Sequence, residues 1–372
     1  MLSRFDPPFR AEHIGSLLRP AHLLDVRSRF GRGEVDRDAL IAAEDRAIKE
    51  ALALQERVGL KLATDGEFRR RSYHSFFYSQ LGDISIDTIA REPSANRQAG
   101  TRAAQPVALV NSRVIWTKPI NVQDFKFIQA NTRLVPKITI PGPCALHFRG
   151  GDASVLASAY TDVEEFWDDV TAAFGKELNA LADAGCRYVQ IDETAFAKFG
   201  DPEVQSWLQA RGDDWNALID KYIVVTNRIL ANAPESLRIG LHLCRGNRGG
   251  RWHAEGSYDV VADRLFNTLD IKFYFLEYDS ERAGTFSPLR LVPANKSVVL
   301  GIVSTKTSTV ESKHDLKLRF EEATRYLPLD RLAISPQCGF ASVDTGNPVS
   351  ADIQEKKLRL TIDLAREIWG EC

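Results

Sequence analysis

The sequence lacks the features that mark membrane, secreted and nucleic-acid-binding proteins. No apolar run approaches the roughly 20 residues that a membrane-spanning helix needs, and residues 1–10 do not have the charged-then-apolar layout of a signal peptide. The net charge is only −2, and Lys and Arg are scattered, which argues against a nucleic-acid or membrane-surface partner. We therefore expect a cytoplasmic protein that acts on small molecules. No pattern in the chain predicts its oligomeric state.

Cysteine is scarce and widely spaced. The five cysteines are Cys144, Cys186, Cys244, Cys338 and Cys372, and no two of them form a Cys-x-x-Cys pair. An odd number of distant cysteines argues against a disulfide framework. The missing pair excludes the usual spacing of a structural zinc site. The thiols are therefore expected to stay reduced and available to a metal.

Short apolar runs alternate with longer amphipathic segments along the chain. The runs predict eight strands at residues 11–15, 59–64, 137–140, 188–191, 239–243, 273–277, 298–303 and 332–335. The main segments predict helices at residues 38–58, 161–184, 214–231, 257–269, 312–326 and 351–369, with caps at Asp36 or Asp38 and at Thr161. Continuous apolar runs indicate parallel strands that are buried on both faces. The pattern predicts one α/β domain over residues 1–372, a TIM (β/α)₈ barrel.

Residues 69–135 interrupt this pattern as an insertion between the second and third strands. Within it, residues 107–116 predict an extended strand and residues 122–130 predict a helix. Long insertions that follow a strand usually shape a binding site. The alternative is a flap without substrate contact, because the tip at residues 93–101 is polar.

Four residues of zinc-ligand type fall at the ends of predicted strands. His242 and Cys244 end the fifth strand, Glu277 ends the sixth, and Cys338 follows the eighth. Taken singly, His242, Cys244 and Cys338 are more often explained by packing, and Glu277 is explained equally well by an ion pair. In a barrel, however, the carboxyl ends of all strands meet at one rim, where catalytic groups lie. One His, two Cys and one Glu favour zinc over magnesium or calcium.

The expected chemistry follows from this ligand set. Thiolate ligands make zinc a modest generator of hydroxide but suit it to binding a substrate thiol as a thiolate nucleophile. The reaction predicted is alkyl transfer to a thiol. The widely separated ligands argue against a structural site, although a barrel with structural zinc and only a binding role is a further alternative.

Other strand ends carry candidate substrate-binding groups. Glu67 and Asp192 could accept hydrogen bonds from a substrate ammonium, or could instead pair with Arg69 or Arg70. Gly15 allows backbone N–H groups to approach a carboxylate, or simply forms a turn. Lys306 could neutralise an anion or donate a proton, or be a solvated lysine. Cys144 is expected to pack in the core.

These residues resemble a known family. The motifs His13-Ile14-Gly15-Ser16, Asp65-Gly66-Glu67, Gln190-Ile191-Asp192-Glu193, His242-Leu243-Cys244, Leu276-Glu277 and Gln337-Cys338-Gly339 occur in the same order. They resemble the catalytic barrel of cobalamin-independent methionine synthase, and above all its short single-barrel homologues. The resemblance covers almost the whole chain.

The resemblance implies a 5-methyltetrahydropteroyltriglutamate–homocysteine S-methyltransferase. It implies zinc on His242, Cys244, Glu277 and Cys338, and homocysteine bound by its thiolate. By the same analogy Ile14, Gly15 and Ser16 contact the amino acid, with Ser16 on its carboxylate, and Glu67 and Asp192 hold its ammonium. A 5-methyltetrahydrofolate is the methyl donor in the family.

The chain departs from the family pattern in ways that affect the donor. It has one barrel where the large enzymes have two, and Lys306 stands where the family has a His after strand seven. Lysine is a poorer proton donor near neutral pH unless its pKa is depressed. A related alternative is an epoxyalkane:coenzyme M transferase, whose thiol sulfonate would use Arg245 or Arg248 and would need neither Glu67 nor Asp192.

Overall fold

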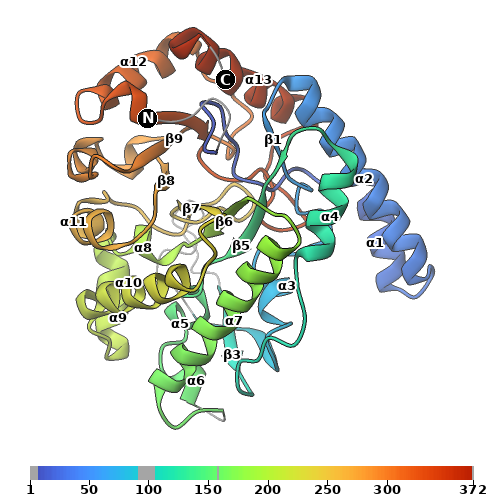
Figure 1. Cartoon of the computed structure of the whole chain (residues 1–372), viewed down its shortest axis with the longest axis vertical. Coiled ribbons are helices and arrows are strands. Elements are labelled where there is room, and N and C mark those ends of the chain that lie inside the picture. Colours follow the sequence, from blue (N-terminus) through green and yellow to red (C-terminus); the bar gives the residue numbers. More distant parts are fainter. Residues whose placement is uncertain (1–6, 91–104, 157–158, 371–372) are drawn as a thin grey trace.

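A parallel β-sheet lies at the centre of the molecule. The computed structural model describes residues 7–90, 105–156 and 159–370. Six parallel strands pair in the order β5-β6-β7-β8-β9-β10, and helices surround them (Figure 1). The strands are β5 (Ile138–Pro141), β6 (Tyr188–Asp192), β7 (Arg238–Leu243), β8 (Phe273–Glu277), β9 (Ser297–Val303) and β10 (Leu332–Pro336). Each matches a predicted strand to within two residues.

The sheet has a parallel neighbour at each end. Strand β1 (Leu62–Ala63) pairs with β4 (Val135–Pro136), which leads directly into β5. At the other end Ala11 forms a parallel bridge with Ile334 of β10. The predicted first strand, residues 11–15, is thus reduced to one bridge. The backbone then leaves the extended region at Gly15, whose φ is 144°.

Most of the long helices begin where a short polar side chain caps them. Asp36 accepts a hydrogen bond from the Ala39 N–H at the start of α2 (Arg37–Val58). Asp162, and not the predicted Thr161, caps α7 (Val163–Asp183) by accepting from the Glu164 N–H. The other helices of eight or more residues are α1 (Ala21–Gly31), α4 (Val122–Asn131), α9 (Pro202–Arg211), α10 (Trp215–Ala231), α11 (Asp259–Thr268), α12 (Lys313–Thr324) and α13 (Ala351–Trp369).

Several shorter elements lie between them. They are α3 (Ser75–Tyr78), α5 (Ala145–Phe148), α6 (Ala153–Leu156) and α8 (Ala195–Lys198), and the 3₁₀ turns η2 (Glu281–Ala283), η3 (Ser287–Leu291) and η4 (Leu329–Arg331). None of the helices in the described residues combines the length and apolar character that crossing a bilayer requires.

Alternate residues of the strands pack into two separate cores. Tyr274 and Leu276 of β8 belong to the large cluster that also holds the helix side chains. Phe273 and Phe275 of the same strand join a small cluster that includes Leu62 of β1 and Ala333 of β10. Successive strand residues point to opposite faces, so the sheet is buried on both sides, as the continuous apolar runs predict.

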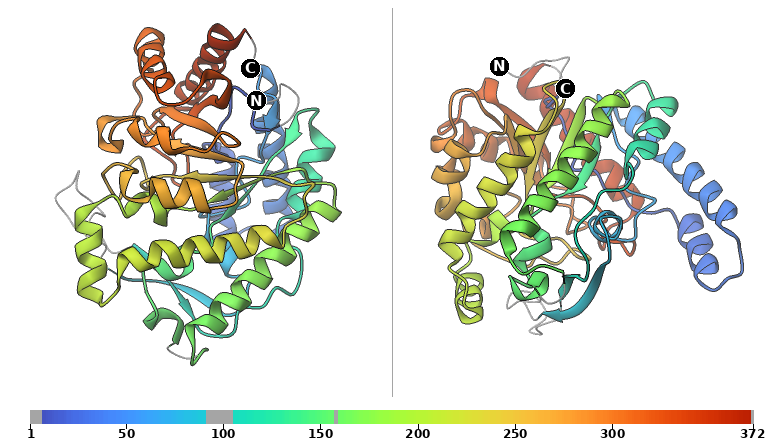
Figure 2. Two further views of the ribbon diagram at one scale, coloured as in Figure 1. Left: turned by 60° about the vertical axis from the view of Figure 1, so that its left-hand side comes forward. Right: turned by 60° about the horizontal axis from the view of Figure 1, so that its bottom comes forward.

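The insertion is a hairpin followed by a helix. Strands β2 (Ile84–Ala90) and β3 (Gln105–Val110) pair antiparallel, and α4 follows. The predicted strand at residues 107–116 was therefore too long, since it ends at Val110. The tip at residues 93–101 lies outside the described residues. Helix α1, which we did not predict, projects from the body beside the start of α2 (Figure 2).

Candidate metal centre and pocket

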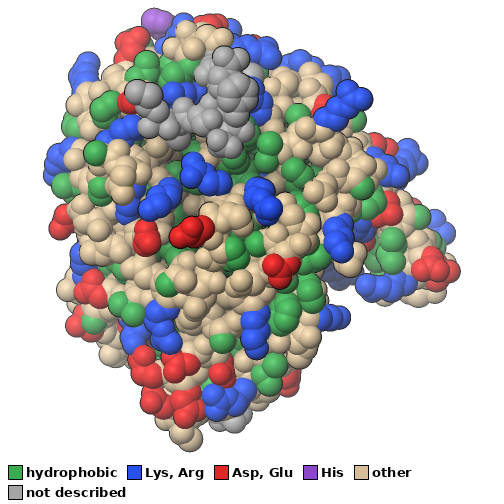
Figure 3. Space-filling view, in the orientation of Figure 1, with side chains coloured by type: hydrophobic (Ala, Val, Ile, Leu, Met, Phe, Trp, Pro, Cys, Tyr) green, Lys and Arg blue, Asp and Glu red, His purple; other side chains and the backbone are tan. Residues whose placement is uncertain are grey.

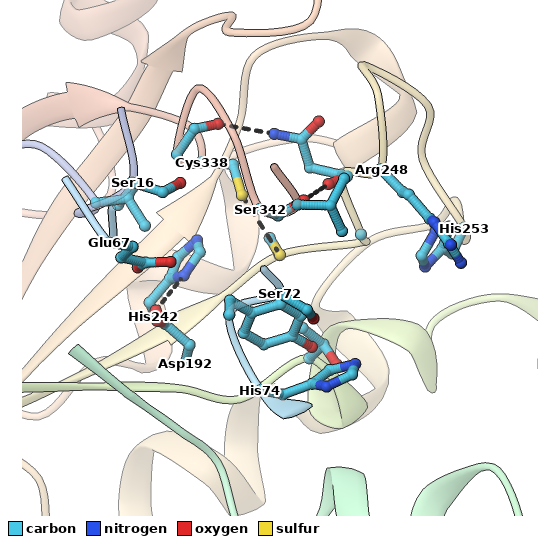
Figure 4. A pocket seen from close by; sticks show the side chains of 18 of the residues that line it. Ser16, Glu67, Ser72, His74, Asp192, His242, Arg248, His253, Cys338 and Ser342 are labelled. Carbon is cyan, nitrogen blue, oxygen red and sulfur yellow. Dashed lines mark hydrogen bonds and ion pairs between the residues drawn. The ribbon is translucent and has the colours of Figure 1, made fainter. Parts of the chain in front are cut away.

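A cavity of about 270 Å³ opens where the strands end. Residues at or just after the carboxyl ends of the strands line it, among them Cys244 and the labelled Ser16, Glu67, Asp192 and Cys338 (Figure 4). This is the edge of a parallel sheet at which loops from many strands converge. On the face seen in Figure 3, acidic and basic side chains are interspersed, in keeping with the small net charge.

Three of the four predicted zinc ligands meet in this cavity. Possible donor atoms of His242, Cys244 and Cys338 all lie within 4.8 Å of one another, and all three residues are buried. Across the residues that the structure describes, this is the one such cluster of His, Cys, Asp or Glu. Cys244 and Cys338 are 94 positions apart, yet their sulfurs are 3.9 Å apart.

The spacing fits zinc. Two sulfurs bound tetrahedrally at about 2.3 Å from one zinc would be about 3.8 Å apart, close to the observed 3.9 Å between Cys244 Sγ and Cys338 Sγ. The His242 Nδ1 atom is 2.8 Å from Asp192 Oδ1, whereas Nε2 is 3.4 Å from the Gln337 carbonyl oxygen. A carboxylate behind a histidine orients the ring with its other nitrogen toward a metal.

The charges favour an anionic sulfur. The hydrogen bond from Cys338 and the positive charge of His242 hold the pKa of Cys244 well below its usual value, against the effect of burial. Burial lowers the pKa of His242, but the Cys244 charge and the Asp192 hydrogen bond outweigh it and raise this pKa to about 10. A thiolate is the form of cysteine that binds metal.

Glu277 lies beside the cluster with its carboxylate already engaged. Its Oε2 accepts from the Arg245 N–H at 2.5 Å, and its Oε1 is 2.9 Å from Lys306 Nζ and 2.5 Å from Arg282 Nη2. Burial raises the pKa of Glu277, but Lys306, Arg282 and Arg245 outweigh it and hold the pKa well below its ordinary value. The charged form that a metal needs is therefore favoured, although Glu277 is not in the three-residue cluster.

Lys306 is buried in the same network. Its Nζ contacts Glu277 and, at 3.5 Å, Asp279 Oδ2, and it is absent from the cavity lining. Burial lowers the pKa of Lys306, but the charges of Asp279 and Glu277 outweigh it and raise the pKa above its ordinary value. A role as proton donor stays a prediction that this environment disfavours, because a useful donor has a pKa near the working pH.

Glu67 is held in a strained backbone conformation. It has a φ of 61°, which is costly for a residue with a side chain, and its N–H donates to Asp65 Oδ1 at 2.9 Å. Its Oε1 accepts from Thr139 Oγ1 and lies 3.7 Å from Arg70 Nη1, while its Oε2 is buried without a partner. Burial raises the pKa of Glu67, which Arg70 opposes and Asp192 reinforces. One carboxylate oxygen thus remains for a ligand, despite the Arg70 contact.

The predicted carboxylate site is built from close backbone contacts. Ile14 and Ser16 line the cavity, but Gly15 does not. A Cβ atom on Gly15 would lie 2.7 Å from Thr139 Cγ2, and one on Gly339 would lie 1.9 Å from Ser16 Oγ. Gly339 therefore allows the loop after β10 to approach Ser16, and Gly15 allows the first loop to approach Thr139 of β5.

The insertion contributes residues to the cavity that the sequence did not indicate. Tyr73, His74 and Ile86 line it, and so does Arg149, which follows α5. No local motif marks these side chains, because their position depends on how the insertion folds back over the strand ends.

The two arginines proposed for a sulfonate differ in their surroundings. Arg248 lines the cavity, whereas the buried Arg245 guanidinium donates to the backbone carbonyls of Gly256 and Glu277 and lies 4.2 Å from the Tyr258 ring centre. Arg245 therefore supports the loop, and only Arg248 of this pair faces the cavity.

Comparison with known proteins identifies the family. The family model "Cobalamin-independent synthase, Catalytic domain" matches residues 9–351. The chain belongs to this family. The uncharacterized protein YxjH of Bacillus subtilis is 36% identical over 97% of this chain and 95% of its own length. The resemblance drawn from the sequence motifs is therefore confirmed.

Members of the cobalamin-independent synthase family differ in length. The 5-methyltetrahydropteroyltriglutamate–homocysteine methyltransferase of Bacillus velezensis is 22% identical over 95% of this chain, which spans only 42% of that protein. Among solved structures, a candidate vitamin-B12-independent methionine synthase from Listeria monocytogenes is 32% identical, with a TM-score of 0.75 over 98% of this chain and 99% of that one.

A second solved structure shares the fold at lower identity. It is a B12-independent methionine synthase from a Shewanella species, in complex with selenomethionine. The identity is 19%, and the TM-score is 0.72 over 96% of this chain and 97% of that one. The described α/β fold with its parallel sheet is thus that of the family's catalytic domain.

Proposed function

We propose that this protein is a zinc-dependent methyltransferase that moves a methyl group from a 5-methyltetrahydrofolate-type donor to the thiol of homocysteine, giving methionine. The observation that carries the proposal is the cluster of His242, Cys244 and Cys338 in the same cavity as two carboxylates, Glu67 and Asp192. The names of the B. velezensis and Shewanella relatives support the same reaction.

The ligands of the proposed metal are His242, Cys244, Cys338 and Glu277. Zinc held there would supply a Lewis acid that lowers the pKa of a substrate thiol. Asp192 keeps the His242 ring in place through the hydrogen bond to Nδ1. The buried Lys306 and Arg282 hold Glu277 ionised beside the two thiols.

The amino-acid end of homocysteine is assigned to the loops beside the metal. Glu67 offers a buried carboxylate oxygen that has no partner in the protein, which suits an ammonium group. Asp192 lies close enough to Glu67 to raise its pKa, so a cation between them would relieve repulsion. Ser16 and the backbone at Gly15 are assigned to the substrate carboxylate.

We also infer that the strands close into an eight-stranded barrel that forms one domain. Beyond the strand pairs described above, the Leu17 N–H donates to the Gly66 carbonyl at 3.1 Å, and Thr64 Oγ1 donates to the Gly15 carbonyl at 2.7 Å. These bonds join the ends of the first and second predicted strands and the residues that follow them. The small core cluster that includes residues of β1 and β10 supports the same closure.

A thiol sulfonate such as coenzyme M is the alternative acceptor, and Arg248 at the cavity favours it. Such a molecule has no ammonium, however, and would leave the Glu67 carboxylate without a partner. Burying an unpaired polar group is costly. The acidic side of the cavity therefore favours an amino-acid thiol.

The experiment that tests the function compares the two thiols on cobalt-substituted protein. Homocysteine is expected to change the thiolate-to-metal absorption band and, with 5-methyltetrahydrofolate, to yield methionine, whereas homoserine, which has oxygen in place of sulfur, changes neither. A band that responds to coenzyme M but not to homocysteine would contradict homocysteine as the acceptor and support a thiol sulfonate instead. A cobalt-loaded protein that responds to neither thiol would leave only a structural role for the metal.

Replacing Asp192 by asparagine is expected to weaken zinc binding by about 10–100-fold, the usual effect of losing the group behind a ligating histidine. The asparagine oxygen can still accept a hydrogen bond from His242 Nδ1–H, but it lacks the negative charge of the aspartate. The measurement is competition with a chromogenic chelator. Asp183→Asn, an exposed carboxylate at the end of α7, is the matched control and should bind zinc as the wild type does. Unchanged zinc affinity in Asp192→Asn would contradict the proposed orientation of His242.

A further inference from the structure

The cavity has two electrically different sides. Glu67 and Asp192 lie together on one side of the two cysteine sulfurs, whereas Arg248 and His74 lie on the other (Figure 4). The proposed function uses the acidic side for the amino-acid thiol. The basic side has no role in that account, although its residues line the same cavity.

His74 presents a buried nitrogen that has no partner. The side chain is 7% exposed and lines the cavity, and its Nδ1 atom makes no hydrogen bond. The ring is fixed in place, because it stacks on Tyr78 with 5.8 Å between ring centres and an angle of 12°. A buried polar atom is costly unless it is paired, so this nitrogen points to a ligand.

Arg248 is held at the edge of the cavity by its own loop. Its N–H donates to the Arg251 carbonyl at 2.9 Å, and the Arg251 N–H donates back at 3.2 Å. The side chain is exposed, and within the described residues no carboxylate pairs with its guanidinium. Arg149, also in the lining, is buried. The charges of Arg149 and Arg248 add to burial in lowering the pKa of His74 to about 3, so the imidazole is neutral.

We propose that Arg248 and His74, with Arg149 behind them, form an anion-binding subsite for a carboxylate, phosphate or sulfonate group of the second substrate. The guanidinium supplies charge and paired donors, and the neutral imidazole supplies one further hydrogen bond. The subsite rests on the methyl-transfer function proposed above and extends it, because it assigns an anionic group to the methyl donor. The same chemistry would also bind the sulfonate of an alternative thiol acceptor.

The experiment measures dissociation constants by calorimetry for the zinc-loaded protein. The variants are Arg248→Gln, which removes the charge, Arg248→Lys, which retains it, and the control Arg71→Gln, an exposed arginine outside the cavity lining. The probes are 5-methyltetrahydrofolate, homocysteine, coenzyme M and inorganic sulfate. A circular dichroism spectrum of each variant verifies that it folds.

Arg248→Gln is expected to raise the dissociation constant of 5-methyltetrahydrofolate by about tenfold or more. This is the effect of losing a hydrogen bond to a charged group. Homocysteine should bind within twofold of the wild type, Arg248→Lys should retain part of the affinity, and Arg71→Gln should change nothing. A different result would be that Arg248→Gln binds coenzyme M or sulfate more weakly, while homocysteine does not bind the wild type. That result would support the subsite and contradict homocysteine as the acceptor. If Arg248→Gln and Arg71→Gln bind every anionic probe equally well, the subsite is overturned, whatever homocysteine does.

Discussion

Replacing Cys338 by serine is expected to abolish zinc binding and methyl transfer together. The serine hydroxyl is a poor zinc ligand at neutral pH, and the substitution removes one of two sulfurs that lie 3.9 Å apart. Loss of a group that only supports a ligand costs about 10–100-fold, so loss of a ligand should lower turnover by more than 100-fold. Metal content by mass spectrometry and methionine formation are measured on the same preparation.

The matched control is Cys186→Ser. Cys186 is also buried, but its sulfur contacts the Tyr188 carbonyl at 3.5 Å, at the start of β6 and outside the cavity lining. A serine hydroxyl can donate to the same carbonyl, so this variant should retain zinc and activity. Full turnover in a zinc-free Cys338→Ser protein would refute the metal mechanism.

Lys137→Met is expected to destabilise the protein by about 3–5 kcal/mol, the range for removing one partner of a buried ion pair. Lys137 and Glu12 are both fully buried, with 3.2 Å between Nζ and Oε2. Burial raises the pKa of Glu12 and lowers that of Lys137, so each charge depends on the other. Without the lysine, Glu12 remains as an unpaired buried carboxyl group. Urea denaturation measures the loss.

A second variant separates the charge from the packing. Adding Glu12→Gln to Lys137→Met should restore much of the stability, because the amide oxygen can still accept from Tyr188 Oη and the Phe9 N–H without a charge. Lys313→Met, which breaks an exposed pair with Glu367, should leave the denaturation midpoint almost unchanged. Equal midpoints for wild type and Lys137→Met would contradict the assignment of a buried ion pair.

The same lysine connects the interior to the candidate metal centre. Lys137 Nζ donates to Gln190 Oε1, and Gln190 Nε2 donates to Asp192 Oδ1 and to the Ile14 carbonyl. Asp192 in turn contacts His242. Stability and the position of the candidate metal ligand are therefore coupled through one chain of hydrogen bonds.

Local patterns were sufficient to predict most of the sheet and the long helices. Apolar runs such as residues 273–277 and 298–303 are nearly continuous and short, so strand positions follow from them. Because parallel strands end at a common edge, the same patterns predicted that His242, Cys244 and Cys338 would meet. Weak patterns gave wrong or missing predictions. Helix α1 was missed because no side-chain cap marks its start, and the first predicted strand forms only one bridge.

The sequence by itself determined the family and the strand end at which each candidate functional residue lies. It also determined which sulfur and nitrogen donors meet in one cavity. Only the tertiary structure decided which partners each charged group takes. Glu277 pairs with Lys306 and Arg282, Asp192 supports His242, and the insertion lines the cavity with Tyr73 and His74. The reason is physical: periodicity follows from local geometry, whereas an ion pair or a stacked ring depends on distances of a few ångströms between residues remote in the chain.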